Sequence, residues 1–177
     1  MKRLLLLTFV LASVWAEAQK FRSHSSNVTF FSEASVEDIA AKNIQGSSIF
    51  NAETGEVVFL IPINQFEFEK SLMQEHFNEK YLESDKYPKA TFEGLINGYN
   101  LSIGTSQPAS AKGKLTIHGV TREVALKGTL LILGDRAKVN AKFTIRLEDY
   151  KIKIPKLLWS NIAEEVDVEV DFDYSKM

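Results

Sequence analysis

The 177-residue sequence contains no cysteine. This absence excludes disulfide-stapled scaffolds, thiol nucleophiles, thiolate metal sites and a lipid-carrying cysteine behind a signal peptide. Lys and Arg (21 residues) nearly balance Asp and Glu (23 residues), which gives a formal charge of −2, and no long basic cluster occurs. The sequence therefore lacks the electrostatic footprint of a polyanion-binding surface, and we expect no nucleic-acid partner.

Residues and motifs that carry chemistry are also sparse. The three histidines, His24, His76 and His118, lie far apart in the chain, and neither a Gly-x-Ser-x-Gly elbow nor a His-Glu-x-x-His motif is present. We therefore predict no catalytic residue, no cofactor and no bound metal, so that the protein is not an enzyme. A hydrolase or isomerase that pairs His76 or His118 with a nearby carboxylate is the catalytic alternative.

The one long apolar run lies near the N-terminus. Lys2 and Arg3 precede the apolar residues 4–14, and the small residues Ala16 and Ala18 follow them. As a helix this run would be about 16 Å long, against roughly 30 Å for the hydrocarbon core of a bilayer. A positive end, a short apolar core and a small-x-small exit are typical of a secretory signal peptide.

We predict that residues 1–18 are this signal peptide, cut between Ala18 and Gln19. The remaining residues, 19–177, then form one domain, which is large enough to bury a core without disulfides. Because no second apolar run of comparable length follows, we expect a periplasmic or secreted protein without stable membrane insertion.

Alternation of apolar and polar residues predicts strands over most of this domain. In the segment 166–174, apolar residues alternate with four acidic ones, as in a strand with one face in water. Segments 122–133 and 142–148 show related patterns, and Gly134 begins a predicted hairpin turn. Further strands are expected at 27–32, 39–50, 57–63, 89–96 and 112–117. The segment 57–63 is apolar at successive positions, so we expect both of its faces to be covered.

About eight strands joined by short turns predict an all-β fold, either a sandwich or a closed antiparallel barrel, and closure removes the exposed strand edges. One segment, 69–83, departs from this pattern. Its apolar residues fall on one face of an amphipathic helix: Leu72, Met73, Phe77 and Tyr81. We therefore predict a β-domain with one helical excursion.

Aromatic residues are abundant in the expected core. An eight-stranded barrel can be wide enough to hold one ligand, and an aromatic-lined cavity suits an apolar chain. The residues that we predict to contact such a ligand are Phe59, Phe66, Phe68, Leu72, Met73, Phe77, Tyr81, Phe92, Ile117, Phe143 and Ile145. The alternative is a structural or stress-protective protein whose interior is filled by side chains and binds no lipid.

Several motifs in combination resemble the YceI-like family of bacterial periplasmic proteins. They are Phe66-Glu67-Phe68, the segment 72–84, Tyr87-Pro88-Lys89-Ala90-Thr91-Phe92, and Gly113-Lys114-Leu115-Thr116-Ile117-His118-Gly119. The resemblance implies a lipocalin-like antiparallel β-barrel with helices near its mouth. It also implies that the central cavity binds an isoprenoid or fatty-acid-like lipid. Some family members are linked to stress or secretion, and exposed strand edges would allow a homodimer.

Overall fold

The computed structural model describes residues 19–33, 38–153 and 164–177. Ten strands form within these residues, and they join a single antiparallel sheet. The strands are β1 (Lys20–Ser32), β2 (Ile39–Asn43), β3 (Ser47–Asn51), β4 (Glu56–Pro62), β5 (Glu67–Phe68), β6 (Lys89–Asn97), β7 (Gln107–Ile117), β8 (Val120–Leu133), β9 (Arg136–Arg146) and β10 (Glu165–Lys176).

Eight of these strands close into a barrel. The ring runs β1, β3, β4, β6, β7, β8, β9 and β10, and β10 pairs again with β1. The closing ladder extends from the pair Phe21 and Lys176 to the pair Phe31 and Asp167. The predicted all-β fold is therefore confirmed, and of the two predicted architectures the closed barrel is the observed one.

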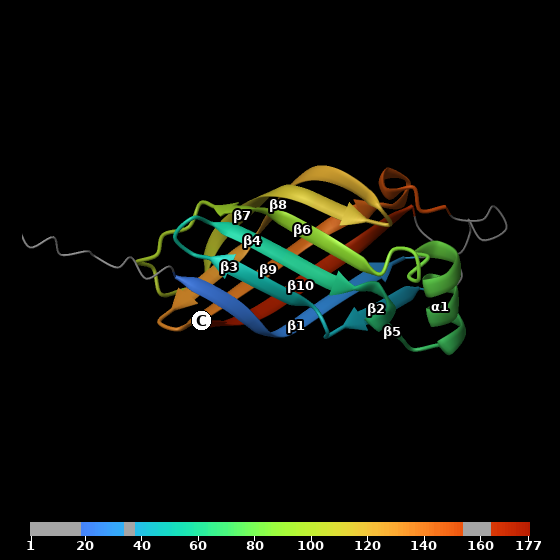
Figure 1. Cartoon of the computed structure of the whole chain (residues 1–177), viewed down its shortest axis with the longest axis horizontal. Helices are drawn as coiled ribbons and strands as arrows, with labels where there is room; N and C mark the ends of the chain where they lie inside the picture. The colour runs from blue at the N-terminus through green and yellow to red at the C-terminus, as the bar shows by residue number, and fades with distance from the viewer. Residues whose placement is uncertain (1–18, 34–37, 154–163) are drawn as a thin grey trace, which may run out of the picture.

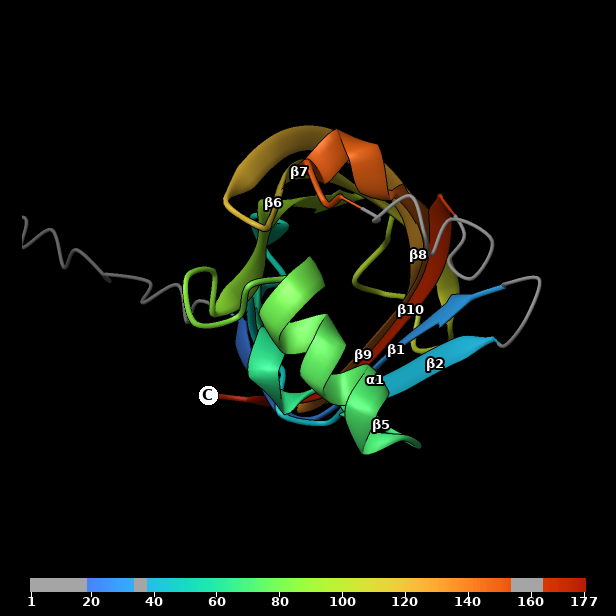
Figure 2. The ribbon, with the colours of Figure 1, turned by 90° about the vertical axis from the view of Figure 1, so that its right-hand side faces the viewer.

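A short helix, α1 (Ser71–His76), lies across one end of the barrel. Figure 1 shows α1 at one end of the long axis and the C-terminus toward the other, and Figure 2 looks onto α1 and the ring of strands behind it. We call these the helix end and the far end. None of the helices in the described residues combines the length and the apolar run that a membrane-spanning helix needs.

The strand predicted over residues 39–50 is split in two. Strand β2 pairs with the second half of β1 and with β5, whereas β3 pairs with the first residues of β1 and with β4. Asn43 lies fully buried at the break, where its side chain donates to the carbonyl of Pro62 (2.7 Å) and accepts from the amide of Gln45 (2.8 Å). These hydrogen bonds satisfy polar groups that the interrupted ladder leaves unpaired.

Two further strand predictions need correction. Strand β1 begins at Lys20, well before residue 27, and it contains a bulge at His24, where a run of polar residues interrupts the alternation. Strand β4 is not covered on both faces. Val57 and Ile61 point into the core, but Val58 is 46% exposed on the outer face. Its successive apolar residues therefore do not indicate a doubly buried strand.

The helix predicted over residues 69–83 is shorter than expected. After α1 the chain forms one π-helical turn, Phe77–Tyr81, in which the amide of Leu82 donates to the carbonyl of Phe77 (2.9 Å). Met73, Phe77 and Tyr81 are spaced by four residues, slightly more than one α-helical turn, so a regular α-helix would rotate them progressively away from the barrel. The wider π turn opposes this rotation and keeps all three against the barrel interior.

Candidate functional site

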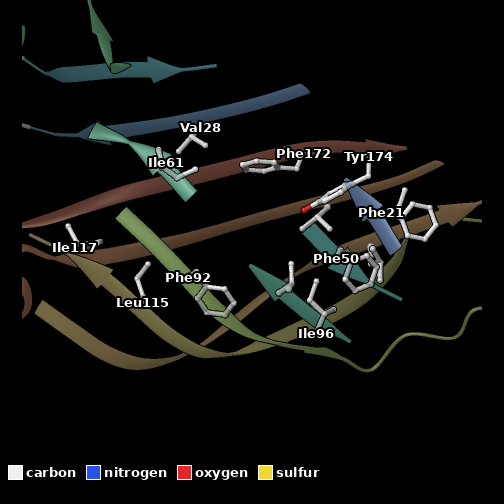
Figure 3. Close-up of a cluster of buried hydrophobic side chains, with 14 of the residues drawn as sticks. Phe21, Val28, Phe50, Ile61, Phe92, Ile96, Leu115, Ile117, Phe172 and Tyr174 are labelled. Atoms are coloured by element: carbon white, nitrogen blue, oxygen red, sulfur yellow. The ribbon is translucent and has the colours of Figure 1, made fainter. Parts of the chain in front are cut away.

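The far end of the barrel is a packed core. Phe21, Phe50 and Tyr174 are at most 1% exposed, and their rings contact one another at centroid distances of 6.3 and 6.4 Å. The buried Tyr174 hydroxyl donates to the hydroxyl of Ser48 (2.8 Å). Figure 3 shows Phe21, Phe50 and Tyr174 grouped together, with Ile117 at the opposite side of the view. This half of the interior is therefore filled by side chains.

A cavity of about 420 Å³ occupies the other half, toward the helix end. Phe59, Phe92 and Phe172 line it on the side of the packed core, with the ring of Phe59 4.9 Å from that of Phe172 and 6.2 Å from that of Phe92. Phe172 in turn contacts Tyr174 at 6.3 Å. These three rings form the floor of the cavity, and its volume is within the range of small-molecule sites.

Small residues on three neighbouring strands leave room for the cavity. Ala109 of β7 lies opposite Gly128 of β8, and Gly128 lies opposite Ala141 of β9. All three line the cavity. A Cβ atom on Gly128 would lie 2.3 Å from the carbonyl oxygen of Asn140 and 3.0 Å from the Cβ of Ala141. At these three positions the wall therefore presents only backbone and methyl groups to the interior, which leaves space beside them unfilled.

An aromatic cluster covers the cavity at the helix end. Phe77 contacts the rings of Phe30 (5.5 Å), Phe66 (5.6 Å) and Phe68 (5.0 Å), and Phe30 also contacts Phe66 and Phe68. Such ring pairs contribute about 0.5–1.5 kcal/mol each beyond the area that they bury. The π turn is therefore anchored to β1 and β5 through one side chain, Phe77.

The structure places ten of the eleven predicted ligand-contacting residues along this cavity. They are Phe59, Phe66, Phe68, Met73, Phe77, Tyr81, Phe92, Ile117, Phe143 and Ile145. Leu72 is the exception and needs correction, because it does not line the cavity and the residue is 58% exposed. It immediately precedes Met73, and adjacent helical residues point about 100° apart. The role of the other ten in ligand binding stays a prediction.

Sequence reasoning missed Phe30, although this residue is at the centre of the aromatic cluster. The two-residue period of Val28 and Phe30, both of which line the cavity, was the available signal. It also missed Phe172 as a floor residue, because an alternating strand does not reveal which inward residues pack and which face open space.

Two polar side chains of the helical segment also line the cavity. They are His76, the last residue of α1, and Tyr81, the last residue of the π turn. Neither forms a hydrogen bond or ion pair with the described part of the chain. Burial raises the pKa of the Tyr81 hydroxyl, so this group stays protonated and can donate a hydrogen bond. The helix end of the apolar cavity, which we call its mouth, therefore carries two polar side chains without protein partners among the described residues.

His118 lies outside the cavity lining and is held by the protein itself. Its Nδ1 lies 3.2 Å from the carbonyl of Tyr150, its Nε2 lies 3.0 Å from a carboxylate oxygen of Glu83, and its ring meets that of Tyr87 at 4.6 Å. Both ring nitrogens are thus engaged by structural partners, which leaves neither free for a substrate. Elsewhere, His24 contacts Ser175 at 3.1 Å on the surface of the far end. The described residues contain no cluster of three His, Asp or Glu side chains suited to a metal ion.

A search of protein-family models matches the YceI-like domain over residues 11–174. The chain belongs to this family. The resemblance seen in the sequence motifs is therefore confirmed, and the cavity described above is the interior of a YceI-like barrel.

Two curated sequence relatives of this YceI-like domain are UPF0312 proteins. The chain is 34% identical over 95 residues to a UPF0312 protein of Pseudomonas putida strain W619. This alignment covers 50% of this chain and 47% of the relative. It is 30% identical over 105 residues to a UPF0312 protein of Pseudomonas savastanoi pv. phaseolicola, covering 55% of this chain and 50% of that protein. The alignments thus span about half the length of the curated relatives that the chain matches.

Solved structures resemble the YceI-like barrel more extensively. A polyisoprenoid binding domain from Saccharophagus degradans, implicated in plant cell wall breakdown, is similar with a TM-score of 0.76 and 17% identity, covering 89% of this chain and 98% of that domain. Burkholderia cenocepacia BcnA is similar with a TM-score of 0.71 and 18% identity, covering 84% of this chain and 95% of BcnA. At these identities the likeness establishes the fold.

Proposed function

We propose that this YceI-like domain is a non-catalytic carrier or store for a long-chain amphiphilic lipid of the polyisoprenoid class. The observation that carries the proposal is the cavity of about 420 Å³, which is lined by aromatic and aliphatic side chains and covered by the helical segment. A structurally similar protein described as a polyisoprenoid binding domain supports the ligand class.

The energetics favour an apolar chain. Burying a methylene group contributes about 0.8 kcal/mol, so ten buried carbons supply roughly 8 kcal/mol before the entropy of association is subtracted. The floor residues Phe59, Phe92 and Phe172 offer only hydrocarbon surface to the end of such a chain. A chain that enters from the helix end would therefore bury its tail against these rings.

The competing view, an interior filled by side chains, describes only the far half of the barrel, where Phe21, Phe50 and Tyr174 pack. Beside the small residues Ala109, Gly128 and Ala141, the cavity leaves space that side chains do not fill. We also propose export of the protein by its residues 1–18, which predicts a mature N-terminus at Gln19 when the protein is sequenced from its native compartment.

Native mass spectrometry of the protein purified from its own host tests the lipid proposal. The expected result is an added mass of a few hundred daltons or more, which organic extraction removes. The matched variants are Ala111→Phe, whose position lines the cavity, and Ala125→Phe, an exposed position on neighbouring strand β8. Only Ala111→Phe should lose the added mass. An unliganded wild type, or equal retention by both variants, would contradict the proposal.

A further inference from the structure

We propose that His76 and Tyr81 form a head-group site at the mouth of the cavity, which binds an uncharged hydroxyl or carbonyl at the polar end of the lipid. This inference rests on the proposed function, because it assigns the orientation of the lipid and the chemistry of its polar end. It follows from where the polar side chains lie, from how the π turn places them, and from the charges around the cavity.

The two ends of the cavity differ in chemistry. The floor is built from Phe59, Phe92 and Phe172, and behind it the packed core closes the far end. The helical segment at the other end contributes His76 and Tyr81, whose polar groups have no protein partner within the described residues. Unpaired polar groups beside an apolar cavity are unfavourable unless a ligand or water satisfies them. The polar end of an amphiphile is therefore expected beside α1, with its chain directed toward the floor.

The π turn brings these two residues to the same side. Residues five apart in a regular α-helix point about 140° away from each other, so only one of the pair would face the cavity. The hydrogen bond from the amide of Leu82 to the carbonyl of Phe77 spans five residues and widens this turn. As a result both His76 and Tyr81 line the cavity. Single π turns inside helices are found frequently at functional sites.

The charges around the cavity favour an uncharged head group. Among the described residues that line it there is no Asp, Glu or Arg, and the one lysine, Lys127, has an exposed side chain on β8. A phosphate or carboxylate moved to this mouth would lose hydration, and no lysine or arginine of the helical segment lines the cavity to pair with it. A hydroxyl or carbonyl oxygen needs only hydrogen-bond partners, and an imidazole and a phenol supply them.

Competition binding with four probes of equal chain length tests the inference. Decane, decan-1-ol, decanoic acid and decyl phosphate would each displace a neutral fluorescent dye, N-phenyl-1-naphthylamine, from the delipidated protein. In the wild type, decan-1-ol should bind at least tenfold more tightly than decanoic acid or decyl phosphate. In the double variant His76→Leu, Tyr81→Phe, the affinity for decan-1-ol relative to decane should fall about tenfold, the effect of losing two hydrogen bonds.

Two control variants separate head-group binding from packing. Leu72→Ala changes an exposed side chain on the same helix and should leave all four affinities unchanged. Met73→Leu changes an apolar cavity residue and should alter the affinities for decane and for decan-1-ol by the same factor. An unchanged alcohol-to-alkane ratio in the double variant, or tighter binding of an anionic probe, would overturn the head-group site while leaving lipid binding intact. If even decane fails to displace the dye from the wild type, the proposed function fails and the head-group site fails with it.

Discussion

Glu83 and His118 are joined by a contact of 3.0 Å between a carboxylate oxygen and Nε2, and both residues have a left-handed backbone, with φ angles of 44° and 51°. Left-handed conformations are unfavourable for residues other than glycine, so the surrounding contacts must hold them. Glu83 follows the π turn, and His118 is in the turn between β7 and β8. This pair therefore fastens the end of the helical cover to the rim of the barrel.

Tyr87 and Gly119 complete this fastening. A Cβ atom on Gly119, whose φ is 71°, would lie 2.5 Å from the ring of Tyr87. Only glycine allows both the backbone angle and the close approach of the ring. Tyr87 can thus lie against the ring of His118, and the two rings meet edge to face at 4.6 Å.

We expect His118→Ala to loosen the helical cover. The variant loses the contacts of both ring nitrogens and the ring contact with Tyr87, and it should reduce the free energy of unfolding by about 2 kcal/mol. Amide hydrogen exchange in residues 77–87 should accelerate more than in the barrel strands, because the lost contacts tie this segment to the rim. His24→Ala, an exposed position at the far end, is the control. Uniform acceleration over the whole chain would argue against a local fastening.

Phe77→Ala should destabilise the cover more than any exposed change in the same segment. It removes three ring contacts, with Phe30, Phe66 and Phe68. Because Phe77 is half-buried, the expected loss is about 2–3 kcal/mol, below the roughly 3–5 kcal/mol for a fully buried phenylalanine. Leu72→Ala, on the exposed side of α1, should change stability by less than about 0.5 kcal/mol. Urea unfolding of both variants checks the difference, and similar losses would mean that Phe77 does not anchor the segment.

The barrel could be predicted from the sequence because its strands alternate. Strand β10 shows this clearly, with Asp167, Glu169 and Asp173 between apolar residues. The apolar spacing of Met73, Phe77 and Tyr81 likewise predicted a helical segment that faces the interior. Periodicity failed for Leu72 because this residue lies next to Met73 in α1, about 100° around the helix, and hydrophobicity alone does not reveal which of two adjacent apolar residues faces the barrel.

Contacts between distant segments could not be predicted in this way. Glu83 and His118 are 35 residues apart, and each is unremarkable in its local sequence. The space beside Ala109, Gly128 and Ala141 also depends on the register of three strands. Local patterns specify which residues face inward, but only the assembled barrel determines whether the interior between them is filled.

Gly128→Ala should destabilise the barrel although it adds only one methyl group. That methyl would lie 2.3 Å from the carbonyl oxygen of Asn140, and backbone cannot move as a flexible side chain can. The expected loss is about 1–3 kcal/mol, typical of overpacking. Gly104→Ala is the matched control, since its added Cβ would meet only the end of the exposed Leu133 side chain, at 3.2 Å. Thermal unfolding of both variants provides the measurement. An equal change in melting temperature would show that β8 and β9 can move apart to accommodate the methyl group without a loss of stability.

The stability of the far end should fall at alkaline pH because of Tyr174. Burial raises the pKa of its hydroxyl well above the usual value, although the hydrogen bond with Ser48 opposes this shift. The folded protein therefore keeps this proton after the unfolded chain, with a tyrosine pKa near 10, has released it. Above about pH 10 the unfolded state binds fewer protons, so the free energy of unfolding decreases as pH rises, by up to about 1.4 kcal/mol per pH unit for this group.

Tyr174→Phe tests this directly. At pH 7 the variant should lose about 0.5–1.5 kcal/mol, since the hydrogen bond to Ser48 disappears. Between pH 10 and 11.5, however, its free energy of unfolding should fall less steeply than that of the wild type, because the group that holds the proton in the folded state is gone. Tyr99→Phe, which removes a half-buried hydroxyl that donates to the carbonyl of Ala52, should retain most of the wild-type slope. Urea unfolding across this pH range measures all three proteins. If the free energy of unfolding of Tyr174→Phe falls with pH as steeply as that of the wild type, the ionisation of other groups controls alkaline unfolding. The buried Tyr174 hydroxyl then makes no measurable contribution to it.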